Sequence, residues 1–205
     1  FVLGKGEMKE VRLELGAPSN TAEGDYYLSF MVETQPEYAD KEFTAKLKTR
    51  IAAPLLVTVS KTGNIEVKGA IKNFSTGGGY SVPFTGNKVR IYDSAAEIPT
   101  VLSIANEGRN FFKTDGSVVL RGLFGERAVY PLQKQNILKA TTRTQRPITL
   151  KGFFLGRYTL SASVSLSDGS VQLSDSTVFY AFPFKILIVG ILGSVAGIMI
   201  LKQKR

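Results

Sequence analysis

The 205-residue sequence contains no cysteine, no histidine and no tryptophan. Without cysteine, the chain cannot form disulfides, zinc–thiolate sites or a thiol nucleophile. Without histidine, it lacks the usual general base near pH 7 and the commonest metal ligand, and a serine–histidine triad cannot be built. These absences favour a protein that is not an enzyme and has no cofactor. A disulfide-free chain outside the cell is more typical of bacteria than of animals.

Basic residues exceed acidic ones, and the formal net charge is +9. Four of the 26 Lys and Arg residues flank the apolar C-terminal stretch, which leaves 22 basic against 17 acidic residues in the rest of the chain. Such an excess favours contact with anionic wall polymers or lipid headgroups, and ordinary solubility explains it equally well. No basic run is dense enough to indicate a nucleic acid partner.

One long apolar run is present, and it determines the expected organisation. Residues 186–201 follow one another with nothing more polar than Ser194. A helix rises about 1.5 Å per residue, so roughly 20 residues cross the hydrocarbon core of a bilayer. Residues 182–201 supply this length and predict a transmembrane helix. The alternative, a buried helix of a soluble core, should show a polar stripe, which this stretch lacks.

Basic residues mark the ends of this predicted span. A basic cluster beside a span indicates the cytoplasmic side, so residues 202–205 should lie inside the cell and residues 1–183 outside. This orientation requires an export signal, which we expect outside residues 1–205 together with some N-terminal strands. The predicted anchor residues are Phe184, Lys185, Gly193, Gly197, Lys202, Lys204 and Arg205.

Residues 1–64 predict the C-terminal part of a first β domain. Lys9–Leu15 alternates polar and apolar residues with the period of a half-buried strand. Tyr26–Glu33 is rich in aromatic and branched residues, and Phe43–Val59 should hold one or two further strands. Thr62–Asn64 is a turn signal that ends the unit.

Residues 65–181 predict a second β domain built from short strands. Ser75–Gly79 (STGGG) should be a flexible loop, and Gly122–Glu126 (GLFGE) should connect a hairpin. The expected strands besides the cleanest one are Ile65–Phe74, Val89–Tyr92, Pro99–Ala105, Ser117–Arg121, Arg127–Leu132, Thr149–Phe154 and Ser170–Tyr180.

Tyr158–Leu166 is the cleanest predicted strand. Tyr158, Leu160, Ala162, Val164 and Leu166 alternate with Thr159 and four serines, and an Asp-Gly turn follows at Asp168. A tyrosine near the start of a penultimate strand resembles the tyrosine corner of immunoglobulin-like domains, so its hydroxyl should bond to nearby backbone. We therefore expect an all-β chain of two immunoglobulin-like antiparallel β-sandwich units, the first one truncated, plus the C-terminal transmembrane helix.

Several short motifs, taken together, resemble bacterial WxL-interacting cell-surface proteins. They are Lys5–Glu7 before KEVRLEL, the break at Pro18, Gly24–Tyr27, Leu102–Gly108, Gly116–Leu120, Leu123–Gly125, Phe154–Tyr158 and the span with its basic end. The resemblance implies an extracellular anchor protein with a peptidoglycan-binding first domain and a second domain that binds a host or partner protein. This chain differs from the family in lacking the start of the first domain and in carrying Gly77–Gly79, and the matched motifs assign no binding residue.

The best candidate for an exposed binding surface is the acid-free segment Pro131–Lys151, although an ordinary solvated loop is an equally good interpretation. Its basic residues are Lys134, Lys139, Arg143, Arg146 and Lys151. A sugar-binding platform of Tyr26, Tyr27, Phe30 and Tyr38 is a further candidate, for which core packing is the better explanation. Asp168 and Asp175 alone make a weak calcium site, so we expect no metal.

Two classes of function remain from the sequence. The first is a membrane-anchored bacterial surface protein whose β-sandwich module binds a cell-wall polymer or a surface partner protein without catalysis. The second is an accessory membrane subunit of a larger envelope complex for secretion, transport or surface-layer assembly. Stoichiometric membrane partners would favour the second class, and retention on purified cell wall the first.

Overall fold

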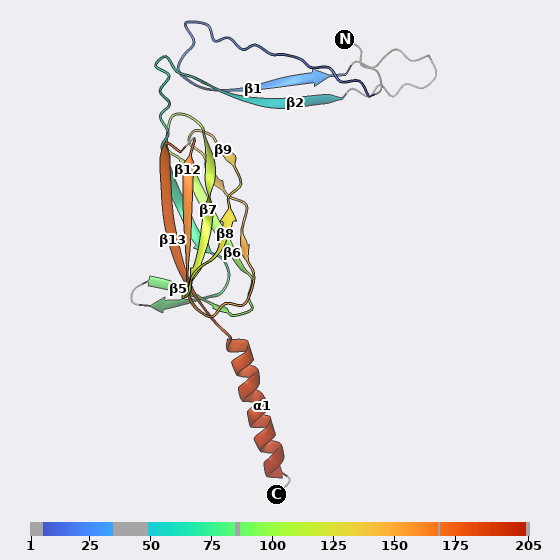
Figure 1. The fold of residues 1–205 in the computed structure, drawn as a ribbon, viewed down its shortest axis with the longest axis vertical. Helices are drawn as coiled ribbons and strands as arrows, with labels where there is room; N and C mark the ends of the chain where they lie inside the picture. Colours follow the sequence, from blue (N-terminus) through green and yellow to red (C-terminus); the bar gives the residue numbers. More distant parts are fainter. Residues whose placement is uncertain (1–5, 35–48, 85–86, 168, 204–205) are drawn as a thin grey trace, which may run out of the picture. The chain divides into compact units, whose positions relative to one another are not determined.

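The computed structural model describes residues 6–34, 49–84, 87–167 and 169–203 (Figure 1). The chain divides into two compact units, Phe1–Asn64 and Ile65–Arg205. Strands are the main regular structure of both units, and α1 (Phe184–Gln203) is the only helix among the described residues. The chain is therefore mostly β with one C-terminal apolar helix, as the sequence predicts.

Unit 1 contains a single two-stranded sheet in its described part. Strand β1 (Gly24–Glu33) pairs antiparallel with β2 (Arg50–Val59) over ten residue pairs. The predicted strand at Lys9–Leu15 is wrong, because residues 7–18 form no strand and Val11 and Leu13 are exposed. A period-two pattern marks the face that a strand would bury, but it does not supply the neighbouring strand that a ladder needs. Residues 43–48 of the predicted Phe43–Val59 strand lie outside the described residues.

Apart from α1, unit 2 is built from two sheets, and below the name unit 2 refers to this β part, residues 65–183. The first sheet places β6 (Ile98–Asn106) between β3 (Gly69–Thr76) and the two short strands β10 (Thr142–Thr144) and β11 (Thr149–Leu150). The second sheet has the order β4-β5-β13-β12-β7-β8, with β9 also paired to β7. Its strands are β4 (Tyr80–Phe84), β5 (Asn87–Asp93), β7 (Phe112–Gly122), β8 (Gly125–Pro131), β9 (Gln135–Ile137), β12 (Gly156–Leu166) and β13 (Val171–Phe182).

The two sheets share one hydrophobic core. Strand β12 confirms the predicted alternation, since Tyr158, Leu160, Ala162, Val164 and Leu166 are all buried. From the first sheet, Ile98, Leu102 and Ile104 belong to the same core cluster. This shared core holds the sheets together and positions the loops at each end of the unit.

Two predictions about unit 2 need correction. Strands β5 and β13 pair in parallel, so the second sheet is not wholly antiparallel. The Ser75–Gly79 segment is not a flexible loop, because Ser75 and Thr76 belong to β3 and the Tyr92 hydroxyl donates a 2.8 Å hydrogen bond to the Gly77 carbonyl. Gly79 has φ +67°, and a Cβ there would lie 2.6 Å from the Tyr92 ring, so the close packing requires glycine.

Helix α1 follows β13 after a single residue, Pro183. It is long and apolar enough to span a membrane, and none of its residues is buried by the rest of the chain. Twenty residues give a length of about 30 Å, which matches the hydrocarbon core. The helix begins two residues later and ends two residues later than the predicted span 182–201.

Candidate functional site

The basic segment is not one polar loop, as the sequence suggests, but a series of short strands that changes sheets. Strand β9 pairs with β7 in the second sheet, whereas β10 and β11 pair with β6 in the first. Ile137, Gln145 and Leu150 are buried between the exposed basic residues and anchor the segment to the core. Arg143 lies on β10 rather than in a loop.

The structure does not bring all five predicted basic residues together. In the β6 ladder, Arg143 is opposite Ile104 and Leu150 is opposite Ile98, which places the region of Lys151 about 20 Å from Arg143 at ~3.3 Å per residue. Lys134 and Lys151 are also engaged in ion pairs, with Asp115 at 2.8 Å and Glu97 at 2.9 Å. The remaining group, Lys139, Arg143 and Arg146, is exposed within eight residues of chain and lies on or beside β10.

The ion pair between Lys134 and Asp115 shifts the pKa of both groups. The hydrogen bond from Lys134 to Asp115 lowers the pKa of that carboxyl, and the backbone N–H of Gly116 lowers it further. The same contact raises the pKa of the Lys134 ammonium. Both groups are solvent-exposed, so this pair contributes little stability.

Strand β10 is an edge strand, because it pairs with β6 and with no second strand among the described residues. Ser103 and Thr144 are joined by a 2.9 Å hydroxyl contact across this pairing, and Gln145 donates its backbone N–H to the Leu102 carbonyl. Basic side chains on an edge strand keep it from pairing with strands of other chains. The exposed cations on or beside β10 also favour the approach of an anionic ligand to this edge.

The predicted anchor residues are placed on α1, except for Lys204 and Arg205, which lie outside the described residues. The first turn of the helix is tied to unit 2, since the Lys185 N–H donates to Asp93 Oδ2 at 3.1 Å and the Phe184 and Tyr80 rings meet edge to face at 5.7 Å. Gly193 and Gly197 are four residues apart and share one face of the helix. No atom outside the helix backbone lies within 4 Å of a Cβ built at either glycine.

Sequence reasoning missed a cluster around Arg127. Its guanidinium donates 2.7 Å hydrogen bonds to the Tyr158 hydroxyl and to the Phe153 carbonyl, and it lies 5.0 Å from the centre of the Phe154 ring. The Tyr158 hydroxyl also accepts the Leu155 N–H at 3.1 Å, which confirms the predicted bond to nearby backbone. These residues are 31 or fewer positions apart in sequence, but no local pattern signals the pairing with Arg127.

The predicted aromatic platform in unit 1 is not supported by the geometry of β1. Successive strand residues point to opposite faces, so Tyr26 and Phe30 share one face and Tyr27 projects from the other. Tyr26 lines an open groove of about 570 Å³ between residues 15–21 and β2, and its hydroxyl donates to the Ala22 carbonyl. Tyr38 lies outside the described residues.

No group of three or more carboxylates lies close enough to hold a metal ion within the described ranges 6–34, 49–84, 87–167 and 169–203. Asp175 is exposed on β13 and accepts the backbone N–H of Ser176, and Asp168 lies outside these ranges. The candidate features within these ranges are therefore a basic edge strand and an apolar helix.

Comparison with known proteins gives no independent identification. No protein-family model and no curated protein sequence matches this chain.

Proposed function

We propose that the chain is a membrane-anchored, non-catalytic surface protein whose unit 2 presents a binding module outside the cell. The observation that carries this proposal is α1, which is apolar on every side, has no buried residue and joins β13 through Pro183 alone. A helix with no polar stripe and no protein cover has its apolar surface satisfied by lipid. In this arrangement residues 1–183 lie outside the cell, and residues 202–205 lie on the cytoplasmic side of the membrane.

Unit 2 is proposed to have an immunoglobulin-like topology. Such a sandwich has strands A, B and E in one sheet and C, F and G in the other. Strands β3, β6 and β10 match the first set, and β7, β12 and β13 match the second in the spatial order G-F-C. Tyr158 lies near the start of the F-like strand, and its hydroxyl accepts a hydrogen bond from the backbone N–H of Leu155, three residues upstream. This bond supports the same assignment.

The resemblance to WxL-interacting cell-surface proteins gives this anchored module its proposed ligand, a cell-wall polymer or a surface partner protein. The surface that fits an anionic polymer best is the β10 edge with Lys139, Arg143 and Arg146, because these cations are exposed and make no ion pair with any described residue. Exposed charges interact over about 8 Å at physiological ionic strength, so binding by this edge should weaken as salt is added.

The test is retention of the detergent-solubilised full chain on purified cell wall. Replacing Lys139, Arg143 and Arg146 together with Gln should reduce retention several-fold in low salt. The matched control replaces three exposed basic residues elsewhere on unit 2, Lys68, Lys88 and Lys113, with Gln and removes the same charge. Equal loss in both variants would show that only net charge matters, and retention that is unchanged by the edge variant and by salt would contradict the proposed edge.

A second candidate function is an accessory subunit of an envelope complex. Gly193 and Gly197 favour it, since small residues four apart on one face allow close helix packing in a membrane. Purification from detergent separates the two proposals. Stoichiometric membrane proteins that are lost from a Gly193→Leu/Gly197→Leu variant would support the subunit, whereas wall retention without such partners supports the binding module.

A further inference from the structure

The junction between unit 2 and α1 leaves almost no spacer. Pro183 alone separates β13 from the helix, and the backbone around it is hydrogen-bonded to the domain. Ser94 donates its N–H to the Phe182 carbonyl at 3.1 Å, and Asp93 accepts the Lys185 N–H. If α1 occupies the hydrocarbon core, this end of unit 2 must lie at the lipid headgroups.

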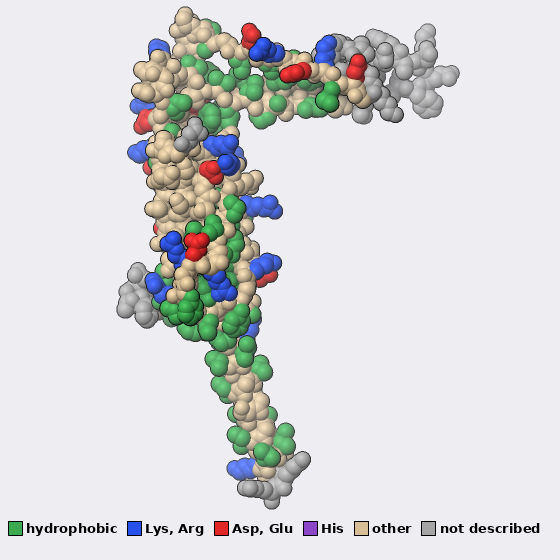
Figure 2. All heavy atoms as spheres, viewed as in Figure 1, with side chains coloured by type: hydrophobic (Ala, Val, Ile, Leu, Met, Phe, Trp, Pro, Cys, Tyr) green, Lys and Arg blue, Asp and Glu red, His purple; other side chains and the backbone are tan. Residues whose placement is uncertain are grey.

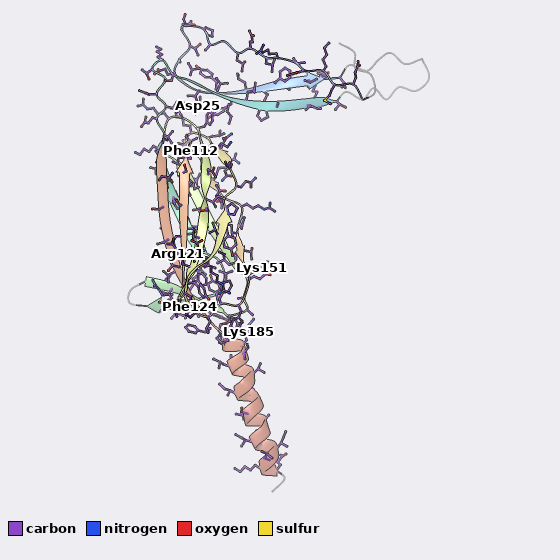
Figure 3. All side chains as sticks on the ribbon, in the orientation of Figure 1. Asp25, Phe112, Arg121, Phe124, Lys151 and Lys185 are labelled. Carbon is purple, nitrogen blue, oxygen red and sulfur yellow. The ribbon has the colours of Figure 1, made fainter. Side chains whose placement is uncertain are left out.

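Strand registers show which loops share this end. Gly156 is opposite Ala181 at the end of β13, so the residues that precede β12 lie level with Phe182. Arg121 is opposite Thr159, which places Gly122 about 10 Å short of Phe182 at ~3.3 Å per residue, and the two-residue β7–β8 turn projects beyond it. Figure 3 shows Phe124 and Lys185 at this end of unit 2 and Phe112 at the opposite end.

The loops at this end expose large apolar side chains where turns usually carry polar ones. Phe124 is 99% exposed and Leu123 is 84% exposed at the tip of the β7–β8 turn. Figure 2 shows apolar side chains gathered over the end of unit 2 from which α1 leaves. We define the apolar rim as Tyr80, Leu123, Phe124, Phe153, Leu155 and Phe182, all of which are exposed.

Basic side chains accompany the apolar rim. Residues 121–127, 151–157 and 182–185 contain five basic residues and one acidic residue, Glu126. The adjacent residues 93–97 add Asp93 and Glu97, of which Glu97 is paired with Lys151 at 2.9 Å, so a basic excess of two remains at this end. Arg127 holds the Phe153 carbonyl, so one of these cations also fixes the loop that carries Phe153 and Leu155. Apolar and aromatic side chains mixed with Lys and Arg are the composition of surfaces that lie in the headgroup region.

We infer that the apolar rim is a lipid-binding surface that inserts into the phospholipid headgroup region and seats unit 2 directly on the bilayer. The inference rests on the proposed membrane anchor and adds a second contact with the same membrane. The continuity of the rim with α1, the single-residue linker and the local basic excess all select lipid as the occupant. The rim thereby fixes the height at which the rest of unit 2 stands above the membrane.

The natural absence of cysteine makes the test direct, because single cysteines can be labelled without background. The full chain is reconstituted in nanodiscs of phosphatidylcholine and phosphatidylglycerol with a nitroxide at the headgroup. An environment-sensitive fluorophore is placed in separate variants at Phe124→Cys, Leu155→Cys, Val189→Cys in α1 and Asn136→Cys on β9. Phe124, Leu155 and Asn136 are exposed, so these substitutions leave the core unchanged.

The labels at Phe124 and Leu155 should be blue-shifted and quenched by the headgroup nitroxide at least about twofold more than the label at Asn136. A Leu123→Ser/Phe124→Ser change should reduce quenching of the Leu155 label several-fold. If Val189 is shielded in the bilayer but Phe124 and Leu155 behave like Asn136, the lipid-binding rim is overturned and the anchor stands. If Val189 also behaves like Asn136, the anchor itself fails. If the label at Phe124 is blue-shifted in native membranes but is not quenched by the nitroxide in nanodiscs, a protein rather than lipid covers the rim. That result would also overturn the inference.

Discussion

The hydroxyl of Tyr158 offers the sharpest test of how unit 2 is held together. Tyr158→Phe keeps the ring, which stacks on Phe179 with centroids 5.3 Å apart and meets Phe154 edge to face. It removes only the acceptor of the 2.7 Å bond from Arg127 and the 3.1 Å bond from the Leu155 N–H. A charge-assisted bond contributes roughly 1.5–3 kcal/mol and a neutral one about 1 kcal/mol.

Arg127 is exposed and can bind water instead, so the expected loss is about 2–3 kcal/mol in the free energy of unfolding. With a urea dependence of ~1–3 kcal/mol/M, the unfolding midpoint should fall by about 0.7–3 M. Circular dichroism of the detergent-solubilised full chain, followed through a urea titration, measures this shift.

Tyr130→Phe is the matched control, because the partly buried Tyr130 packs against the same core as Tyr158 but its hydroxyl makes no hydrogen bond within the described residues. The control should change the free energy of unfolding by no more than about 0.5 kcal/mol. A Tyr158→Phe midpoint within error of the Tyr130→Phe midpoint would refute the role given to the hydroxyl. A double-mutant cycle with Arg127→Met should return a coupling of at least about 1 kcal/mol.

Further predictions concern the core, a close backbone approach and pH. Leu160 is fully buried, so Leu160→Asp should cost at least about 4 kcal/mol and yield no folded unit 2 by limited proteolysis, whereas Ser163→Asp on the exposed face of β12 should fold. Gly116→Ala should cost about 2–4 kcal/mol in urea titrations, because its Cβ would clash with the Ser163 carbonyl at φ +147°, whereas Gly190→Ala in α1 has open space. The pKa of Asp115 is lower in the folded chain than its value of about 3.9 in the unfolded chain, so the ionised carboxylate stabilises the fold above that pH. This stabilisation is lost as the pH falls through the folded pKa. The Asp115→Asn variant should therefore lose less stability than the wild type between about pH 5 and pH 2.

Sequence patterns over neighbouring residues predict β12 and α1 correctly. The alternation of Tyr158–Leu166 identifies β12 and its buried face, and the uninterrupted apolar run locates α1 within two residues at either end. The Leu123–Phe124 turn also falls inside the predicted hairpin connection Gly122–Glu126, between β7 and β8. In each case the residues that make the structure are neighbours in sequence.

Sequence patterns do not predict features that depend on pairing between segments far apart in the chain. Lys9–Leu15 has the period of a strand but forms no strand in the described part of the chain, and the parallel pairing of β5 with β13 joins segments about 90 residues apart. The basic segment was expected to be one loop because its charges dominate the composition, but the buried Ile137, Gln145 and Leu150 attach it to both sheets. The apolar turn at Leu123 and Phe124 was visible in the sequence, and only the strand registers show that it shares an end with α1.

The most direct test of the proposed anchored arrangement is labelling with a membrane-impermeant maleimide in wall-stripped cells that make the protein. Ser163→Cys, exposed on β12, and Gln203→Cys, at the end of α1, provide one site on each side of the proposed span. The account predicts that Ser163→Cys reacts in intact cells and that Gln203→Cys reacts only after permeabilisation. Labelling of Gln203→Cys in intact cells, with Ser163→Cys protected, would contradict the orientation and with it the surface role of unit 2.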